Sequence, residues 1–287
     1  MIPGERPYIP GFHYNETKFQ HTCFKFTQFF KEKIMPVFFQ NQPVEFFEKE
    51  GGDLVSETDK IIESKLMEFL PKILPVPILS EEKETAWPPP MGNFWLIDPL
   101  DGTHNYLAGI DAFGVSIVLV ENYMPTFTAV FLPSEEKCSG RGIYFAGIQR
   151  GAHRKTETGT QSIHVSQKKK ISEAFLLIEG QKNTLSEKAL RLIEKTWRFR
   201  NGISSSWSGT RIAAGEIFPN GADILISIES KPWDTLPNAL LAEEAGGRVT
   251  DFNGQEITLS NCANLIFTNE NLHQTALDII NNHQNQK

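Results

Sequence analysis

Apolar residues recur at spacings of three and four along several stretches of the chain, and each such stretch predicts an amphipathic helix. The first covers residues 16–40, with Pro43 as its breaker, and the second covers residues 57–70, with Pro71 behind it. Shorter helices are predicted over residues 185–196, 211–218, 236–244 and 270–281, and the third of these meets Gly246-Gly247, a good C-terminal stop. Residues 1–15 are expected to form an irregular arm.

Runs of apolar and β-branched residues lie between these helices and predict strands. They cover residues 94–97, 115–120, 126–131, 143–146, 175–178, 224–228, 248–251 and 264–268. Strands that interleave with helices throughout the chain favour an α/β or α+β fold in stacked layers. A change of character near residues 180–187 predicts two parts, an N-terminal α+β half over 1–184 and a C-terminal α/β half over 185–287.

Composition removes several classes of protein. The chain has 287 residues, of which 40% are hydrophobic, and a net charge of −7. With no basic stripe, a nucleic acid polymer is not the expected partner. Apolar runs stay well below the roughly 20 residues that span a membrane. The three cysteines lie far apart, and the start of the chain lacks a signal-peptide pattern, so we expect a reducing, cytoplasmic location.

The strand predicted over 94–97 ends abruptly in two carboxylates, within the stretch WLIDPLDGTHNY. Asp-Pro and Asp-Gly are both turn signals, so a plain turn is one reading. The other reading is a cation site. Asp98 could bridge two cations, Asp101 could bind one, and the carbonyl of Leu100 could complete a shell of the hard oxygen ligands that Mg²⁺ prefers. Gly102 and Thr103 would then begin a helix or turn whose free N–H groups face an anion.

Three further acidic stretches allow the same two kinds of reading. DLVSETD, over residues 53–59, is either a helix N-terminus with its caps or part of a site. Glu81 and its neighbour in Ser-Glu-Glu are either solvated surface or ligands. Asp234, in KPWDTLP, is well placed to cap the helix that follows, and capping is compatible with a second role.

Taken together, and in this order, the four stretches resemble the inositol monophosphatase family, whose members are Mg²⁺-dependent, lithium-sensitive phosphomonoesterases. The resemblance covers about residues 45–270, with IDPLDGTHNY and KPWDTLPNALLAEEAGGRVTD as the two signatures. It implies an αβαβα sandwich of the inositol monophosphatase / fructose-1,6-bisphosphatase type. It also implies two or three Mg²⁺ ions and a homodimer.

The resemblance assigns metal ligands residue by residue. Glu81, Asp98 and the Leu100 carbonyl would form the first Mg²⁺ site. Asp98, Asp101 and Asp234 would form the second, and Glu81 would share a third ion through water. Two cations about 3.5–4 Å apart can lower the pKa of water on one side of a phosphoryl group and stabilise the leaving oxygen on the other.

The resemblance also implies the catalytic and substrate-binding residues. Asp59 would pair with Thr103 and, with Glu81, belong to the catalytic set that orients and deprotonates the attacking water. Ser208-Gly209-Thr210 resembles a substrate loop. Arg211 follows it, either as an exposed helix arginine or as a contact to a second anionic group. Glu229 is a stand-in for a hydroxyl-binding glutamate, although its segment is shorter than in the family. The expected substrate-binding set is Asp101, Gly102, Thr103, Gly209, Thr210, Arg211, Glu229 and Asp234.

The expected function is therefore Mg²⁺-dependent hydrolysis of a small phosphate monoester, first of all inositol 1-phosphate or a similar polyol phosphate. Activity as a 3′(2′),5′-bisphosphate nucleotidase, histidinol-phosphatase or fructose-1,6-bisphosphatase is the alternative within the same chemistry. An inactive binding or regulatory protein on a phosphatase scaffold is the alternative of another class. The complete acidic set argues against that class, because buried carboxylates are costly without cations.

Overall fold

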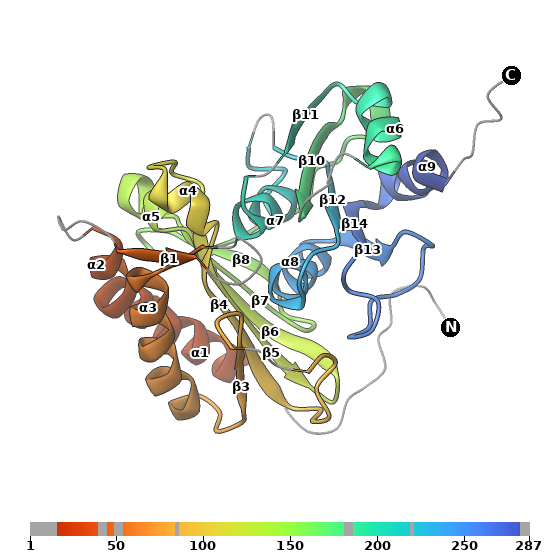
Figure 1. Cartoon of the computed structure of the whole chain (residues 1–287). Coiled ribbons are helices and arrows are strands. Elements are labelled where there is room, and N and C mark those ends of the chain that lie inside the picture. Colours follow the sequence, from red (N-terminus) through yellow and green to blue (C-terminus); the bar gives the residue numbers. More distant parts are fainter. Residues whose placement is uncertain are drawn as a thin grey trace, which may run out of the picture.

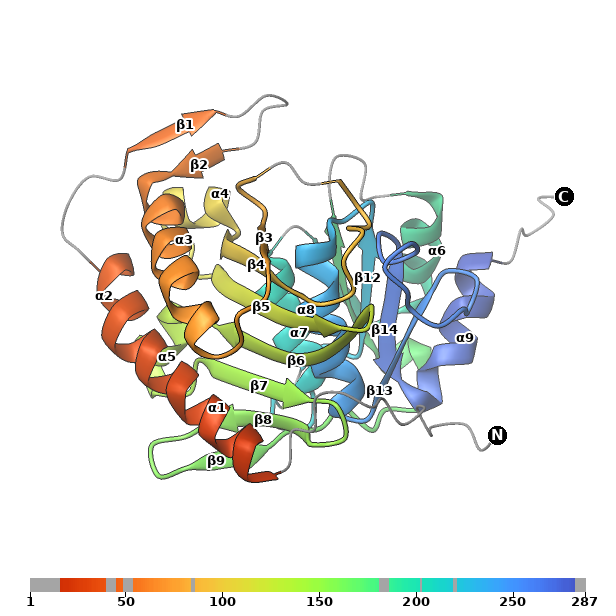
Figure 2. The same cartoon turned by 90° about the horizontal axis from the view of Figure 1, so that it is seen from below.

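The computed structural model describes residues 16–39, 45–48, 54–83, 86–180, 186–201, 203–218 and 221–281. The arm predicted for residues 1–15 and the breaker Pro43 lie outside these ranges. The described residues form alternating layers of helices and sheets (Figures 1 and 2). The predicted αβαβα sandwich is confirmed.

The first layer consists of helices that cover one face of the larger sheet (Figure 2). It contains α1 (Glu16–Phe29), a π-helical turn (Phe30–Ile34), α2 (Met35–Phe38) and α3 (Glu57–Phe69). Aromatic contacts join this layer to the sheet and its helices to one another: the Phe30 and Phe131 rings stack with centroids 4.9 Å apart, and Phe26 of α1 lies edge-on to Phe69 of α3. The helix predicted over residues 16–40 thus exists, with one π turn inside it.

The larger sheet has seven strands in chain order. They are β3 (Ile78–Ser80), β4 (Phe94–Asp101), β5 (Gly114–Glu121), β6 (Met124–Phe131), β7 (Ile143–Gly147), β8 (Gly151–Lys155) and β9 (Thr160–Ser162). Only the β3–β4 pair in this sheet is parallel. A separate two-stranded ribbon, β1 (Phe46–Glu48) with β2 (Leu54–Ser56), and the short helices α4 (Thr103–Leu107) and α5 (Pro133–Ser139) lie at its margins.

The smaller sheet has five strands in the order β11-β10-β12-β14-β13. These are β10 (Phe175–Gly180), β11 (Arg198–Asn201), β12 (Ile224–Ile228), β13 (Gly247–Asp251) and β14 (Leu265–Asn269). Helices α7 (Ser205–Ala213) and α8 (Pro232–Glu244) fill the space between the two sheets, and α6 (Glu187–Lys195) and α9 (Glu270–Asn281) cover the outer face. The central helices therefore contact both sheets through one apolar core.

Several sequence-based boundaries were wrong, and two of them bear on the site. The helix predicted over 211–218 begins six residues earlier, at Ser205, because the Ser204 hydroxyl caps it by accepting a hydrogen bond from Trp207 N at 3.2 Å. The strand predicted over 94–97 does not end in a turn but runs on to Asp101, which pairs with Gly114. The strand thus carries both carboxylates of its own sequence motif.

The proposed division of the chain at residue 184 stays a prediction. Strand β10 precedes that point and belongs to the smaller sheet. All three cysteines are free, two of them buried. Among the residues that the structure describes, no helix combines the length and the apolar character needed to cross a membrane.

Candidate active site

Three carboxylates from two distant segments meet where β4 ends and α8 begins. One side-chain oxygen from each of Asp98, Asp101 and Asp234 lies within 4.8 Å of the other two. The pairing register of β4 shifts between Asp98 and Asp101, and Leu100 N donates to Asp98 Oδ1 at 3.0 Å across that irregularity. Asp234 is the third residue of α8, where its Oδ2 accepts from Lys231 N at 3.1 Å. These are the Asp residues that the sequence predicts to converge.

Glu81 reaches the same place from the neighbouring strand. Parallel pairing sets Ser80 beside Ile97, and Glu81 N then donates to the Ile97 carbonyl at 3.1 Å. Its carboxyl group therefore lies beside Asp98, with which it shares a hydrogen bond. A hydrogen bond between two carboxyl groups needs a proton between them. A cation can take the place of that proton.

The electrostatics of this cluster fit a bound cation. Burial raises the pKa of Asp98 well above its usual range, and repulsion from Glu81 and Asp101 adds to that effect. Burial likewise raises the pKa of Asp234, and repulsion from Asp101 is the next largest cause. Asp98 is only 1% exposed. Carboxylate oxygens held together in this way are the hard donors that Mg²⁺ prefers, and a divalent cation would relieve their mutual repulsion. The residues present therefore suit the metal that the family uses.

A hydroxyl–carboxylate pair stands next to the cluster. Thr103 Oγ1 lies 3.2 Å from Asp59 Oδ1 and 2.9 Å from the Leu100 carbonyl oxygen, so its single proton can be donated to either acceptor. Asp59 is fully buried and is fixed by Ser56, whose backbone N–H donates to Asp59 Oδ2 at 2.8 Å. Burial raises the pKa of Asp59, while the Ser56 and Thr103 hydrogen bonds oppose that rise. The predicted pairing of Asp59 with Thr103 is thus present in the geometry.

Gly102 permits the tight passage from β4 into α4. Its φ is +83°, in the left-handed region. A Cβ there would also lie 3.0 Å from the Ala112 carbonyl oxygen. Glycine is therefore required where the chain turns from Asp101 to Thr103.

The N-terminus of α7 holds Asp101 in place, and the sequence analysis missed this. Asp101 Oδ2 accepts from the Ser204 hydroxyl at 2.6 Å and from Ser206 N, while Oδ1 accepts from Ser205 N at 3.3 Å. Backbone N–H groups at a helix start suit a carboxylate. The run of three serines before an apolar helix is a capping signal that could have indicated this role.

A second missed residue, Glu179, supports the same helix start. Its Oε1 accepts from Ile203 N at 3.1 Å, from Ser204 N at 3.2 Å and from the Ser208 hydroxyl at 2.6 Å. Burial raises the pKa of Glu179 to about 7, and the Ser208 hydrogen bond opposes that rise. The sequence signal is a carboxylate at the end of a buried strand, the same pattern that drew attention to Asp98.

The residues predicted to bind the rest of the substrate do not gather in one loop. Gly209 and Thr210 lie inside α7 and are buried, with Gly209 packed against Asn238. Arg211 pairs with Glu135, with 3.3 Å between Nη2 and Oε2. Glu229 is exposed and has a left-handed backbone, with φ +53°. The structure thus brings together the carboxylates, Gly102 and Thr103, while these four residues lie elsewhere on α7 or after β12.

Known proteins resemble this chain in sequence and in fold. The sequence profile of the inositol monophosphatase family matches residues 22–285. The chain is 26% identical over 247 residues to the fructose-1,6-bisphosphatase/inositol-1-monophosphatase of Thermotoga maritima, which covers 83% of this chain and 87% of that protein. It is also 26% identical to the histidinol-phosphatase of Mycobacterium tuberculosis, over 79% and 84% of the two chains.

A solved structure supports the fold. Staphylococcal inositol monophosphatase-1, soaked in lithium chloride as an inhibitory complex, superposes with a TM-score of 0.74 over 96% of this chain and 98% of that one. The sequence identity is 21%, so this likeness concerns the fold alone. The match of the family profile, over more than nine-tenths of the chain, is what decides membership. The chain belongs to the inositol monophosphatase family and is a phosphoric monoester hydrolase.

Proposed function

We propose that this protein hydrolyses a small phosphate monoester with Mg²⁺, and that inositol monophosphate or a similar polyol or sugar phosphate is its substrate. The observation that carries the proposal is the buried group Asp98, Asp101 and Asp234 beside the Asp59–Thr103 pair. The three aspartates offer oxygen ligands for cations, and the Asp59–Thr103 pair offers a proton acceptor. Hydrolysis of a phosphate monoester by metal-activated water uses both.

Two or three Mg²⁺ ions would be held by Glu81, Asp98, the Leu100 carbonyl, Asp101 and Asp234. When bound, the ions supply positive charge for the phosphoryl group and for the leaving oxygen, and they acidify water. The protein contributes the spacing of the carboxylates. The α7 N-terminus fixes Asp101 through Ser204, and the α8 start fixes Asp234. Both carboxylates are thereby held before a substrate arrives.

Thr103 and Asp59 would position the attacking water. When Thr103 donates its proton to Asp59 Oδ1, the lone pairs of its oxygen are free to accept a proton from water. Asp59 can then receive the proton through the hydroxyl, with Glu81 as the second catalytic carboxylate. The backbone N–H groups of Gly102 and Thr103, together with Asp101 and Asp234 through their cations, would face the phosphate.

The choice of a polyol phosphate follows the relatives with inositol in their names, such as the Thermotoga protein. The histidinol-phosphatase relative has the same sequence identity, so identity alone does not separate these substrates. Histidinol phosphate, fructose 1,6-bisphosphate and 3′-phosphoadenosine 5′-phosphate are therefore the comparison substrates. Contacts of Gly209, Thr210, Arg211 and Glu229 with the organic part of the substrate stay predictions.

The test is phosphate release from a panel of these esters, with Mg²⁺ and with EDTA. We expect fastest turnover of inositol 1-phosphate and loss of turnover in EDTA. Asp98→Asn should lose about a thousandfold in turnover, whereas Asp278→Asn, at an exposed carboxylate on α9, should match the wild type. Faster turnover of histidinol phosphate or the nucleotide would overturn the choice of substrate. A folded, Mg²⁺-loaded protein that hydrolyses no ester would instead be a binding or regulatory protein.

We also propose that the protein is a homodimer, which sedimentation of the full chain would test. A monomer at the concentrations of the activity assay would contradict this. A small-molecule phosphate ester, rather than a nucleic acid polymer, is the proposed partner. Its cytoplasmic location stays a prediction.

A further inference from the structure

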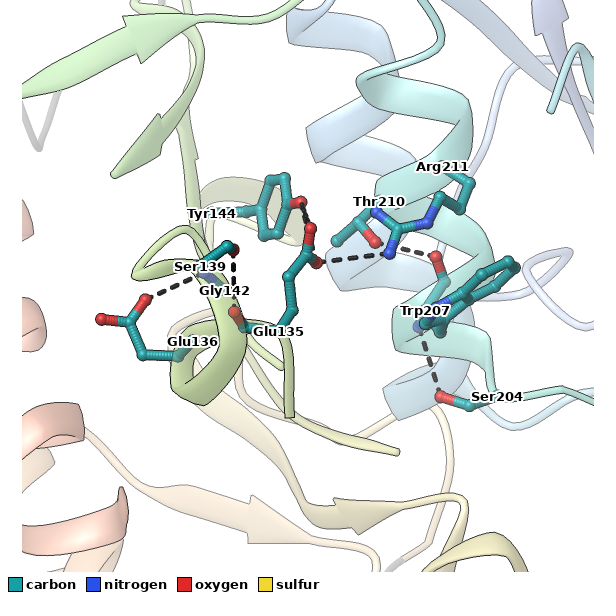
Figure 3. Close-up of polar contacts among 9 residues, drawn as sticks. All are labelled: Glu135, Glu136, Ser139, Gly142, Tyr144, Ser204, Trp207, Thr210 and Arg211. Atoms are coloured by element: carbon teal, nitrogen blue, oxygen red, sulfur yellow. Dashed lines mark hydrogen bonds and ion pairs between the residues drawn. The ribbon is translucent and has the colours of Figure 1, made fainter. Parts of the chain in front are cut away.

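Two of the predicted cation ligands, Asp101 at the end of β4 and Asp234 in the first turn of α8, lie on segments far apart in the sequence. The start of α7 lies against Asp101: the Ser204 hydroxyl donates to Asp101 Oδ2 at 2.6 Å and caps the helix by accepting from Trp207 N (Figure 3). The next residue, Ser205, donates its N–H to Asp101 Oδ1 at 3.3 Å. Asp101 is thus fixed relative to the first turn of α7.

Asn238 connects that turn of α7 to the residue that carries the other ligand. Its side-chain Nδ2 donates to the Ser205 carbonyl oxygen at 2.9 Å and to the Asp234 carbonyl oxygen at 2.7 Å. Asn238 is only 1% exposed, so bulk water does not compete for these two bonds. A path of four residues therefore runs from Asp101 through Ser205 and Asn238 to Asp234.

The start of α8 is fixed on another side by β5. Pro237 lies inside α8 and has no N–H, so the Trp233 carbonyl oxygen lacks the helical donor that another residue would supply. The Ser116 hydroxyl donates to that oxygen at 3.1 Å instead. Ser116 lies on β5 and pairs with Asp98 in the sheet. The first turn of α8 is therefore attached to the strand beside Asp98 and, through Asn238, to α7.

Stability alone does not account for an asparagine at this position. Its Oδ1 is buried and has no hydrogen-bond partner within the described part of the chain. The amide cannot be turned over to satisfy that oxygen, because Oδ1 would then face two carbonyl oxygens. A buried acceptor without a donor costs about as much as one or two buried hydrogen bonds contribute. What the asparagine provides is the placement of its two donated bonds, which set the distance between α7 and the first turn of α8.

We infer that Asn238 is a positioning residue for the cation site, which fixes the separation of Asp101 and Asp234 by joining α7 to α8. The inference rests on the proposed function, because it concerns the cations that these two carboxylates would share. The Asn238 Oδ1 packs against Gly209 and its Nδ2 is used twice, so the residue acts through the two aspartates and not as a ligand. Removing a group that orients metal ligands typically costs about ten- to a hundredfold in metal affinity.

The test is cation binding by the full chain without substrate, because turnover alone would not separate positioning from a loss of stability. Free Mn²⁺ is followed by electron paramagnetic resonance, and Mg²⁺ binding by calorimetry. We expect Asn238→Ala to weaken the binding of at least one cation by about tenfold or more. The Mg²⁺ concentration that gives half-maximal phosphate release should rise by a similar factor, whereas turnover at saturating Mg²⁺ should fall less.

Asn269→Ala is the matched control. Asn269 is also a buried asparagine whose Nδ2 donates to two main-chain carbonyl oxygens, those of Ser166 at 2.8 Å and Lys168 at 2.9 Å. It ends β14 beside the start of β12, whereas Asp234 follows the other end of β12. This variant should lose stability in urea unfolding, yet bind cations as the wild type does.

Wild-type cation affinity in Asn238→Ala would overturn the inference. Equal weakening in Asn269→Ala would also overturn it, because the effect would then follow from lost stability. If Asn238→Ala fails to fold, Asn238→Ser is the second variant: a hydroxyl has one proton and can serve only one of the two carbonyls, so cation binding should again weaken. Wild-type affinity in that variant would equally contradict the inference. A wild-type protein that binds no cation would instead overturn the proposed function, and this inference with it.

Discussion

Glu179→Gln should change how the stability of the protein depends on pH. Burial raises the pKa of Glu179 from 4.5 to about 7 in the folded protein. A group with a raised pKa in the folded state holds a proton that the unfolded chain has already lost. The stability that this proton represents is therefore present at low pH, declines above about pH 4.5, and is gone once the pH has passed about 7. Glutamine has no proton to lose, so this decline should vanish in the variant.

The size of the effect follows from the shift. A difference of about 2.5 units corresponds to about 3 kcal/mol, of which about 2–3 kcal/mol falls between about pH 5 and about pH 8. Glutamine can still accept from Ile203 N and Ser204 N, and any loss at the Ser208 hydroxyl is the same at every pH. Relative to the wild type, the free energy of unfolding of the variant should therefore rise by that amount as the pH rises. This holds whatever the difference in stability between the two proteins at low pH.

The assay is urea unfolding in EDTA at several pH values, with the free energy of unfolding compared between the two proteins. Glu256→Gln, at an exposed carboxylate, controls for the loss of one charge. A difference between wild type and Glu179→Gln that stays constant from about pH 5 to about pH 8 would refute the reasoning. It would mean that Glu179 is ionised in the folded protein over that whole range.

Three further predictions concern the carboxylate cluster and its surroundings. Asp98→Asn should lower turnover by about a thousandfold, equivalent to about 4 kcal/mol, and wild-type turnover would contradict its role. In EDTA the variant should unfold at no lower urea concentration than the wild type, because the amide replaces a buried carboxyl group that is costly to ionise and its oxygen can still accept from Leu100 N. Asp59→Asn should lower kcat by about a hundredfold or more with little change in KM, because it removes the proton acceptor. Steady-state kinetics would measure this, and a change in KM alone would argue against proton transfer. Gly102→Ala should lower the free energy of unfolding, measured in urea, by about 1–2 kcal/mol or more. The reason is the left-handed backbone of this residue and the nearby Ala112 carbonyl oxygen, and unchanged stability would contradict it.

Local chemistry marks each acidic segment in the sequence, but that the segments converge on one site was predicted through the resemblance to the family. Asp98 and Asp101 follow a buried apolar run, and Asp234 stands where a helix begins. Each position has a physical reason that is visible within a few residues. The alternation of strands and helices likewise predicted the layers.

The surroundings of the cluster could not be predicted in the same way. The resemblance placed Gly209 and Thr210 in a substrate loop. The serines before them start a helix instead, and Gly209 packs closely against Asn238. Contacts between Asp101 and Ser204, about a hundred residues apart, depend on how two sheets sandwich α7. Propensity within a short window carries no information about such contacts.

The central claim is that these carboxylates hold the cations at which the phosphate ester is cleaved. Anomalous diffraction from crystals of the full chain soaked in Mn²⁺, a stand-in for Mg²⁺, tests it most directly. The account predicts manganese peaks at ligand distance from Asp98, Asp101 and Asp234, with a peak beside Glu81 as well. Manganese bound elsewhere in a catalytically active protein, with these carboxylates bare, would contradict it.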